Sequence, residues 1–193
     1  MKIETDTLEQ KKPVKKHSVG REIIEWAVTL ALAVGLALCV HAWVGELITV
    51  EGPSMEPNLQ AGEKVLVGKV EYYFAKPKRG DIVIIKFPDR TEDIIKRVIA
   101  TEGEKISVSG GSVFIDGRKL GEPYVTEPID GDFAEQTVPP GTIFVMGDNR
   151  NDSHDSRAVG PIPLDKVLGR AYLIVWPIDN WAKLTVYLGN LIK

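Results

Sequence analysis

The chain has 193 residues, of which 44% are hydrophobic and 26% are charged, and its formal net charge is −3. This length and hydrophobic share suffice for one globular domain preceded by one membrane anchor. The mild acidity, with no basic stripe in the domain, argues against a nucleic-acid partner. The single cysteine excludes an intrachain disulfide.

The N-terminal part combines a polar tail with a long apolar run. Residues 1–25 are polar and mixed in charge, and we expect a cytoplasmic tail with little fixed structure there. In residues 26–45 only Thr29 and His41 are polar, and a helix of that length is roughly 30 Å long, enough to span a bilayer. Basic residues before the run predict a cytoplasmic N-terminus and an extracytoplasmic remainder. A cleavable signal peptide is the alternative, but its apolar region would be shorter, at about 7 to 15 residues.

The stretch Val50–Leu59, V-E-G-P-S-M-E-P-N-L, predicts a stiff and irregular loop. Pro53 and Pro57 fix their own φ angles and restrict the residues before them. Ser54 is therefore presented from backbone that is neither helix nor regular strand. A turn serine bonded to its own backbone is the more common reading of such a stretch taken alone, so the case for a nucleophile depends on the rest of the chain.

Residues 46–193 predict a mainly β extracytoplasmic domain, because short β-rich runs alternate with turn signals from Glu63 onward. Gly110-Gly111 predicts a two-residue hairpin turn. Residues 103–140 are richer in Gly, Pro and acidic residues and predict a smaller β excursion. The expected strands are K-V-L-V-G, D-I-V-I-I-K-F-P, D-I-I-K-R-V-I-A, K-I-S-V-S, S-V-F-I-D, T-I-F-V-M-G and A-Y-L-I-V-W-P.

A nucleophilic serine needs a base, and histidine is scarce in this chain. Of the three histidines, His17 is on the cytoplasmic side, His41 is in the apolar run, and only His154 lies beyond it. The G-x-S-x-G elbow fails because Glu56 replaces its second glycine, and no S-x-x-K motif occurs. Lysine is the remaining class of candidate.

Lys96 lies in the predicted strand Asp93–Ala100, whose two faces are both largely apolar. Burial disfavours the ammonium form and lowers the pKa of a lysine from its ordinary value of about 10.4, whereas Arg97 cannot be neutralised in this way. Lys96 is thus a sensible general base. The alternatives are that it snorkels from an edge strand or that Lys86, in a similar run, takes the role.

The segment Gly147–Arg157, G-D-N-R-N-D-S-H-D-S-R, is a dense polar loop directly after a predicted strand. Polar loops of this kind are usually solvated turns. This one carries Asp155 and Arg157 two residues apart, able to pair, and hydroxyls at Ser153 and Ser156. It is therefore a candidate brace for a site.

Four boxes in this order resemble the bacterial type I signal peptidases. They are G-P-S-M-E-P-N-L, R-G-D-I-V-I, K-R-V-I-A and the polar loop, and they follow a single N-terminal apolar run. The resemblance covers about Trp26–Pro177 and is nearest to the compact Gram-positive members. It implies a mostly β catalytic core with a small β excursion, carried by one N-terminal transmembrane helix in the cell membrane.

The resemblance also implies a chemistry, namely removal of signal peptides from translocated preproteins without a cofactor or metal. Ser54 would be the nucleophile and Lys96 the general base, with Ser153 hydrogen-bonded to the lysine amine. Asp155 and Arg157 would form a structural salt bridge. The positions that match pockets for small side chains at the −1 and −3 positions of the substrate are Val50, Met55, Leu59, Ile94 and Ile95.

One position departs from part of the family. In some relatives the residue two before the nucleophile is a serine that helps to bind the oxyanion, and here it is Gly52. The oxyanion hole would then use backbone N–H groups, such as that of Ser54, or a donor that the sequence does not identify.

Two other functions remain open from the sequence. A self-cleaving Ser-Lys protein would share the dyad but would carry a cytoplasmic DNA-binding domain, for which the 25 residues before the apolar run are too few. A membrane-tethered β module that binds a partner without turnover would not need the dyad. The final stretch Trp181–Ile192 has helical spacing, and its apolar side would face either the domain or the bilayer surface.

Overall fold

The computed structural model describes residues 19–88 and 91–180, without the side chains of residues 19, 38–44, 73 and 180. The predicted helical stretch Trp181–Ile192 lies outside the described residues. By its internal contacts the chain divides into two units, residues 1–40 and 41–193. Each unit is considered by itself.

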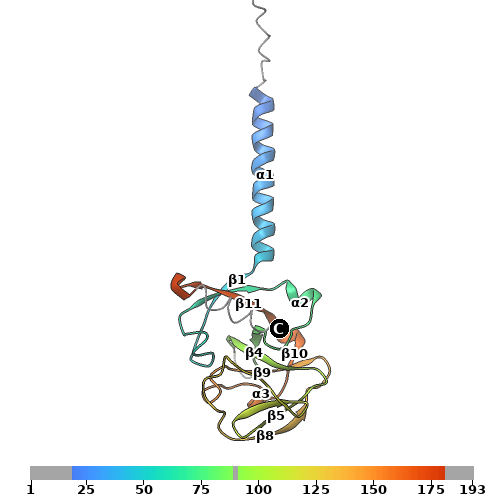
Figure 1. Ribbon diagram of the computed structural model, residues 1–193. Helices are drawn as coiled ribbons and strands as arrows, with labels where there is room; N and C mark the ends of the chain where they lie inside the picture. Colours follow the sequence, from blue (N-terminus) through green and yellow to red (C-terminus); the bar gives the residue numbers. More distant parts are fainter. Residues whose placement is uncertain (1–18, 89–90, 181–193) are drawn as a thin grey trace, which may run out of the picture. The chain divides into compact units, whose positions relative to one another are not determined.

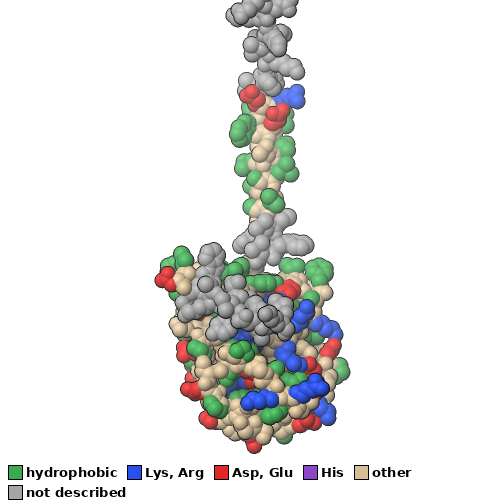
Figure 2. All heavy atoms as spheres, viewed as in Figure 1, with side chains coloured by type: hydrophobic (Ala, Val, Ile, Leu, Met, Phe, Trp, Pro, Cys, Tyr) green, Lys and Arg blue, Asp and Glu red, His purple; other side chains and the backbone are tan. Residues whose placement is uncertain are grey.

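The first unit contains most of helix α1 (Val19–Val44). The helix begins seven residues before the apolar run, which corrects the expectation of little structure for residues 19–25. Its first turns are polar, and Arg21 pairs with Glu25 one turn later. Figure 2 shows charged side chains at this end and hydrophobic ones along the described length. Within residues 19–88 and 91–180, no helix meets the length and apolarity expected of a membrane span.

The second unit is built on an antiparallel sheet of seven strands (Figure 1). Strands β3 and β4 lie in the middle of the sheet, and β1 and β10 lie at its edges. In spatial order the strands are β1 (Glu46–Thr49), β2 (Lys64–Gly68), β11 (Val167–Trp176), β3 (Ile82–Lys86), β4 (Asp93–Thr101), β9 (Thr142–Met146) and β10 (Ile162–Pro163).

A smaller antiparallel sheet lies between β4 and β9 in the sequence, inside the range 103–140. Gly110 and Gly111 join β5 to β6 with φ angles of +55° and +76°, a turn in which both central residues need positive φ. The mainly β fold expected from the sequence is confirmed. The strands, in spatial order, are β7 (Arg118–Lys119), β6 (Ser112–Ile115), β5 (Lys105–Ser109) and β8 (Phe133–Thr137).

Beyond α1, the helical elements described within residues 45–88 and 91–180 are short. They are α2 (Glu71–Phe74), α3 (Ser156–Val159) and two 3₁₀ turns, Leu164–Lys166 and Ile178–Asn180. Helices of one turn cannot show the 3.6-residue period, which is why the sequence did not indicate them.

Both faces of the central strands are buried. Ile84 and Ile95 pack in one apolar cluster, while Val83 and Val98 pack in another on the opposite face. Successive side chains of a strand point to opposite faces, so the two clusters sandwich β3 and β4. Any polar side chain in the middle of β4 is therefore taken out of water.

Candidate active site

The serine loop between β1 and β2 is held at its base and by its side chains. Val50 donates its N–H to the carbonyl of Glu63 at 2.7 Å, which closes the loop. Inside it, Leu59 donates to the carbonyl of Met55 at 2.9 Å, and both side chains are buried in the core. The apolar side chains thus pin the loop, and Ser54 stands half-buried on it.

Lys96 of β4 meets this serine. Its Nζ lies 2.6 Å from Ser54 Oγ, although the two residues are 42 positions apart in the sequence. Only 3% of Lys96 is exposed, because β4 is an inner strand of the sheet and both of its faces are covered. The rival Lys86 is exposed at the end of β3. The ring of His154 is exposed and stands edge-on to that of Phe87, with ring centroids 5.5 Å apart.

The polar loop after β9 lies against the serine backbone. Asn149 donates its N–H to the carbonyl of Ser54 at 3.0 Å, and its side-chain amide donates to the carbonyl of Pro53 at 3.3 Å. A Cβ on Gly147 would come closer than 3.0 Å to both the Ser54 carbonyl oxygen and Ser153 Oγ. Only glycine allows this approach of the two segments.

Ser153 is close to the serine loop, but it does not make the expected bond. Its buried hydroxyl oxygen has no hydrogen-bond partner in this structure, so the predicted bond to the Lys96 amine is not made. The side chain lies against Gly147 instead. The backbone carbonyl of Ser153 accepts a hydrogen bond of 3.5 Å from the Arg157 guanidinium.

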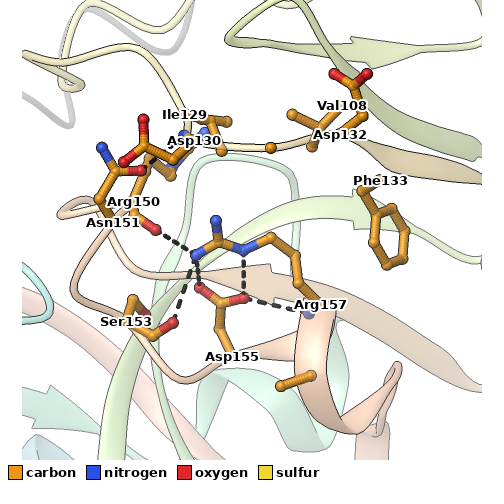
Figure 3. A pocket seen from close by; sticks show the side chains of 12 residues that line it. Val108, Ile129, Asp130, Asp132, Phe133, Arg150, Asn151, Ser153, Asp155 and Arg157 are labelled. Atoms are coloured by element: carbon orange, nitrogen blue, oxygen red, sulfur yellow. Dashed lines mark hydrogen bonds and ion pairs between the residues drawn. The ribbon is translucent and has the colours of Figure 1, made fainter.

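Asp155 and Arg157 form a two-pronged ion pair, with Nε to Oδ1 and the second guanidinium nitrogen to Oδ2 both at 2.8 Å (Figure 3). The Asp155 carboxylate also caps α3 and accepts the N–H of Gly147 at 3.1 Å. Arg157 donates to the carbonyl of Arg150 at 2.6 Å. The pair thereby fixes both ends of the polar loop, beside a cavity of about 390 Å³ that faces the smaller sheet.

The five predicted pocket residues do not all lie together. Val50, Met55, Leu59 and Ile95 belong to one apolar cluster. Ile94 is only partly buried and packs against the cluster on the other face of β4. The alternation of side chains along a strand separates neighbours 94 and 95 in this way.

Sequence reasoning missed a second buried polar group, beside Lys96. Arg97 is fully buried and makes two hydrogen bonds to Asp148, at 2.7 and 2.6 Å. Burial opposes the charge of this guanidinium, but the Asp148 carboxylate outweighs that effect and the pKa of Arg97 is raised. The sequence did contain a signal for this group. A second cation beside Lys96, in a strand with two apolar faces, must be buried, and a buried charge needs an acidic partner from another segment. The other members of the group are Asn58, Glu122, Tyr124 and Arg150.

A serine hydroxyl within hydrogen-bonding distance of a buried lysine amine, with no imidazole between them, is the arrangement of Ser-Lys hydrolases. The comparisons with known proteins place the chain in a peptidase family. The profile of the family described as "Signal peptidase, peptidase S26" matches residues 23–176. The chain therefore belongs to the signal peptidase family, and it is a serine endopeptidase.

Several relatives are similar over most of their length. Signal peptidase I of Bacillus licheniformis is 37% identical over 91% of this chain and 98% of its own. Signal peptidase I of Leptolyngbya laminosa is 36% identical over 84% of each chain. Signal peptidase I T of Bacillus subtilis (strain 168) is 35% identical over 93% of this chain and 97% of its own. The crystal structure of a signal peptidase I from Enterococcus faecalis is 32% identical, with a TM-score of 0.46, over 50% of this chain and 97% of that one.

Proposed function

We propose that the protein removes signal peptides from translocated preproteins, with Ser54 as nucleophile and Lys96 as general base. The observation that carries this proposal is the distance of 2.6 Å between Ser54 Oγ and the amine of a lysine that is 3% exposed. A buried amine loses its proton more readily than an exposed one, because burial lowers its pKa. It can then accept a proton from the hydroxyl.

The reaction proceeds in two halves through an acyl-enzyme. The neutral amine of Lys96 takes the proton of Ser54 as Oγ bonds to the scissile carbonyl carbon, and a tetrahedral intermediate forms. The C–N bond then breaks, and the lysine ammonium gives its proton to the departing amine. In the second half Lys96 takes a proton from water, the resulting oxygen attacks the ester, and the proton returns to Ser54 as the signal peptide leaves.

The oxyanion hole is proposed to use backbone donors. Gly52 has no side chain to donate and adopts a φ of +74°. The N–H of Ser54 is the first candidate donor to the developing negative oxygen. Substrate binding is proposed to use the apolar residues beside the serine, Val50, Met55, Leu59 and Ile95, with Ile94 at the opposite face of β4.

The polar loop is proposed to support this chemistry without taking part in it. Asp155 and Arg157 would hold the loop whose Asn149 contacts the carbonyl of Ser54. Ser153, with its buried and unpaired hydroxyl, would accept or donate a hydrogen bond once substrate reorganises the site. A buried hydroxyl without a partner is costly, and such cost is typical of functional sites.

The cellular placement is also a proposal. We propose that residues 26–45 anchor the protein in the cell membrane, with residues 1–25 in the cytoplasm and residues 46–193 outside. Support comes from the large apolar side chains along the described part of α1, which are at least half exposed to solvent. A helix that is apolar all round needs cover, and a bilayer would supply it.

The test is processing of a purified preprotein by the full-length protein in detergent, with Ser54→Ala as the matched control. Wild type should yield one mature product whose new N-terminus follows a small residue. The Ser54→Ala protein should yield none. Equal processing by both proteins, or none by wild type on several preproteins, would rule the proposal out. The same assay separates a peptidase from a binding module and from a protein that cleaves only itself.

A further inference from the structure

A group of buried charges lies outside the Ser54–Lys96 pair and is not used in the proposed reaction. Arg150 of the polar loop makes two hydrogen bonds to the carboxylate of Glu122, at 3.0 and 2.5 Å. Their side chains are 1% and 9% exposed. Glu122 follows β7, so it comes from the excursion and not from the catalytic sheet.

Tyr124, two residues further on, joins this pair to the buried pair of Arg97 and Asp148. Its ring centroid lies 4.0 Å from the guanidinium carbon of Arg97 and 5.9 Å from that of Arg150. Its hydroxyl donates to Glu122 at 3.0 Å. Burial, and then the charge of Glu122, raises the pKa of Tyr124 above its ordinary value, so the hydroxyl stays protonated and remains a donor.

The same segment also contacts the serine loop. Asn58, four residues after the nucleophile, donates its side-chain amide to the carbonyl of Tyr124 at 2.7 Å and to Asp148 at 2.9 Å. Residues 122–124 therefore contact the three segments that carry the site: the serine loop, the strand of Lys96 through its neighbour Arg97, and the polar loop through Arg150.

We propose that Glu122 and Tyr124 are positioning residues, by which the excursion sets the distance between Ser54 and Lys96. This inference rests on the proposed Ser-Lys chemistry. The serine and the lysine come from a loop and a strand with no local connection, and a misplacement of about 1 Å at a reacting group can cost roughly a hundredfold in rate. Buried, charge-assisted bonds are stiff enough to hold such a distance. Removing one charge leaves its partner charge buried and unpaired, so the segment that carries the partner shifts.

The experiment compares Glu122→Gln, Glu122→Asp and Tyr124→Phe with wild type in preprotein cleavage by the full-length protein. Glu135→Gln is the matched control, because Glu135 is a carboxylate of the same excursion and its pair with Lys105 is half exposed. Circular dichroism first sets a temperature at which every variant is folded, and kcat and KM are then measured separately at that temperature.

The expected result is that kcat falls about tenfold or more in Glu122→Gln and severalfold in Tyr124→Phe, with KM within about threefold of wild type. Glu122→Asp, which keeps the charge, should lie between wild type and the glutamine variant, and Glu135→Gln should match wild type. A purely stabilising role would lower the melting temperature and leave the kcat of folded protein unchanged.

Wild-type kcat in folded Glu122→Gln and Tyr124→Phe would overturn the inference. If Glu122→Gln does not fold, Tyr124→Phe decides, since it removes one hydroxyl and keeps the ring between the two guanidinium groups. Failure of the inference is distinct from failure of the proposed function, because the latter would appear as an inactive wild type or an active Ser54→Ala.

Discussion

Among single residues, the proposed reaction depends most on the charge state of the Lys96 amine. Lys96 is enclosed by β3 and β9, and its Nζ lies at hydrogen-bonding distance from Ser54 Oγ. Lys86, on the neighbouring strand, has a similar sequence setting but an exposed side chain. Burial is therefore what distinguishes a candidate base from an ordinary surface lysine.

Replacing Lys96 with alanine should lower kcat by roughly 10⁴-fold or more, as loss of the base does in serine proteases. Lys96→Arg should be equally inactive, because a guanidinium keeps its proton at working pH. Preprotein cleavage with Lys86→Ala as control measures both. Activity within tenfold of wild type in either Lys96 variant would exclude the lysine as base.

The activity of the wild type should depend on pH through the same amine. Since the neutral form is the base, activity should be low in acid and rise as the amine loses its proton, with a midpoint below the ordinary lysine value of about 10.4. The measurement is kcat/KM against pH over the range in which the protein stays folded. A flat profile from about 6 to 10 would contradict a titrating lysine.

Gly147 should tolerate no side chain, because a Cβ there would overlap the Ser54 carbonyl oxygen and Ser153 Oγ. We expect Gly147→Ala to lower kcat by roughly a hundredfold, since the backbone of the nucleophile must shift. Gly121→Ala is the control, because a Cβ at Gly121 meets no atom within 4 Å. Equal kcat in the two variants would show that the two loops need not lie so close.

At the scale of elements, the polar loop and β4 are held by ion pairs of different burial. The Asp155–Arg157 pair is partly accessible through the arginine, which is 18% exposed, whereas both members of the Arg97–Asp148 pair are fully buried. Buried pairs add little net stability as a unit, but breaking one by removing a partner is costly. The two pairs therefore differ in what mutation should do.

Asp148→Asn should destabilise the protein by about 3–5 kcal/mol, because the charge of Arg97 would stay buried without its counter-ion. Thermal and denaturant unfolding of the full-length protein provide the measurement. Asp165→Asn, in an exposed pair with Lys166, should change stability by less than about 1 kcal/mol. Similar losses in the two variants would mean that the buried pair relaxes into contact with water.

The strands that the sequence predicted are those with apolar alternation or a continuous apolar run. β2, β3, β4, β5, β6 and β9 coincide with predicted runs to within a few residues, and the predicted run A-Y-L-I-V-W-P forms the second half of β11. β8, F-A-E-Q-T, was missed because its residues are only partly buried or exposed, so it has no apolar side to read. β7 and β10 have two residues each, which is too few for a period of two to appear.

The residues of the site can likewise be predicted only where a local sequence pattern marks them. The scarcity of bases and the two apolar faces of β4 made Lys96 a candidate beside Lys86, and the family resemblance then selected Ser54 and Lys96 as the pair. Asn58 contacts Tyr124 and Asp148, and Arg150 contacts Glu122. These contacts join residues 28 to 90 positions apart, and no local pattern encodes such pairings. All five pocket residues were placed by resemblance, and the alternation of β4 sets Ile94 on the face opposite to Ile95, which is the face of Lys96.

In the whole molecule, the sequence of the endopeptidase domain follows directly after an apolar helix. Ser54 lies nine positions after Gly45, a span of at most about 30 Å if fully extended. A nucleophile so tethered would stay near the surface of the bilayer, where a signal peptide emerges during translocation. The proposed anchor would therefore help to bring the nucleophile to the substrate.

Acyl-enzyme mapping tests whether Ser54 carries the acyl group. The full-length protein is mixed with an activated ester of a signal-peptide fragment, quenched in acid within the first turnover, digested and examined by mass spectrometry. We expect one added acyl mass, confined to the fragment that contains Ser54 and absent from the Ser54→Ala protein. An acyl group on another serine, or an unaltered yield of adduct in Ser54→Ala, would contradict it.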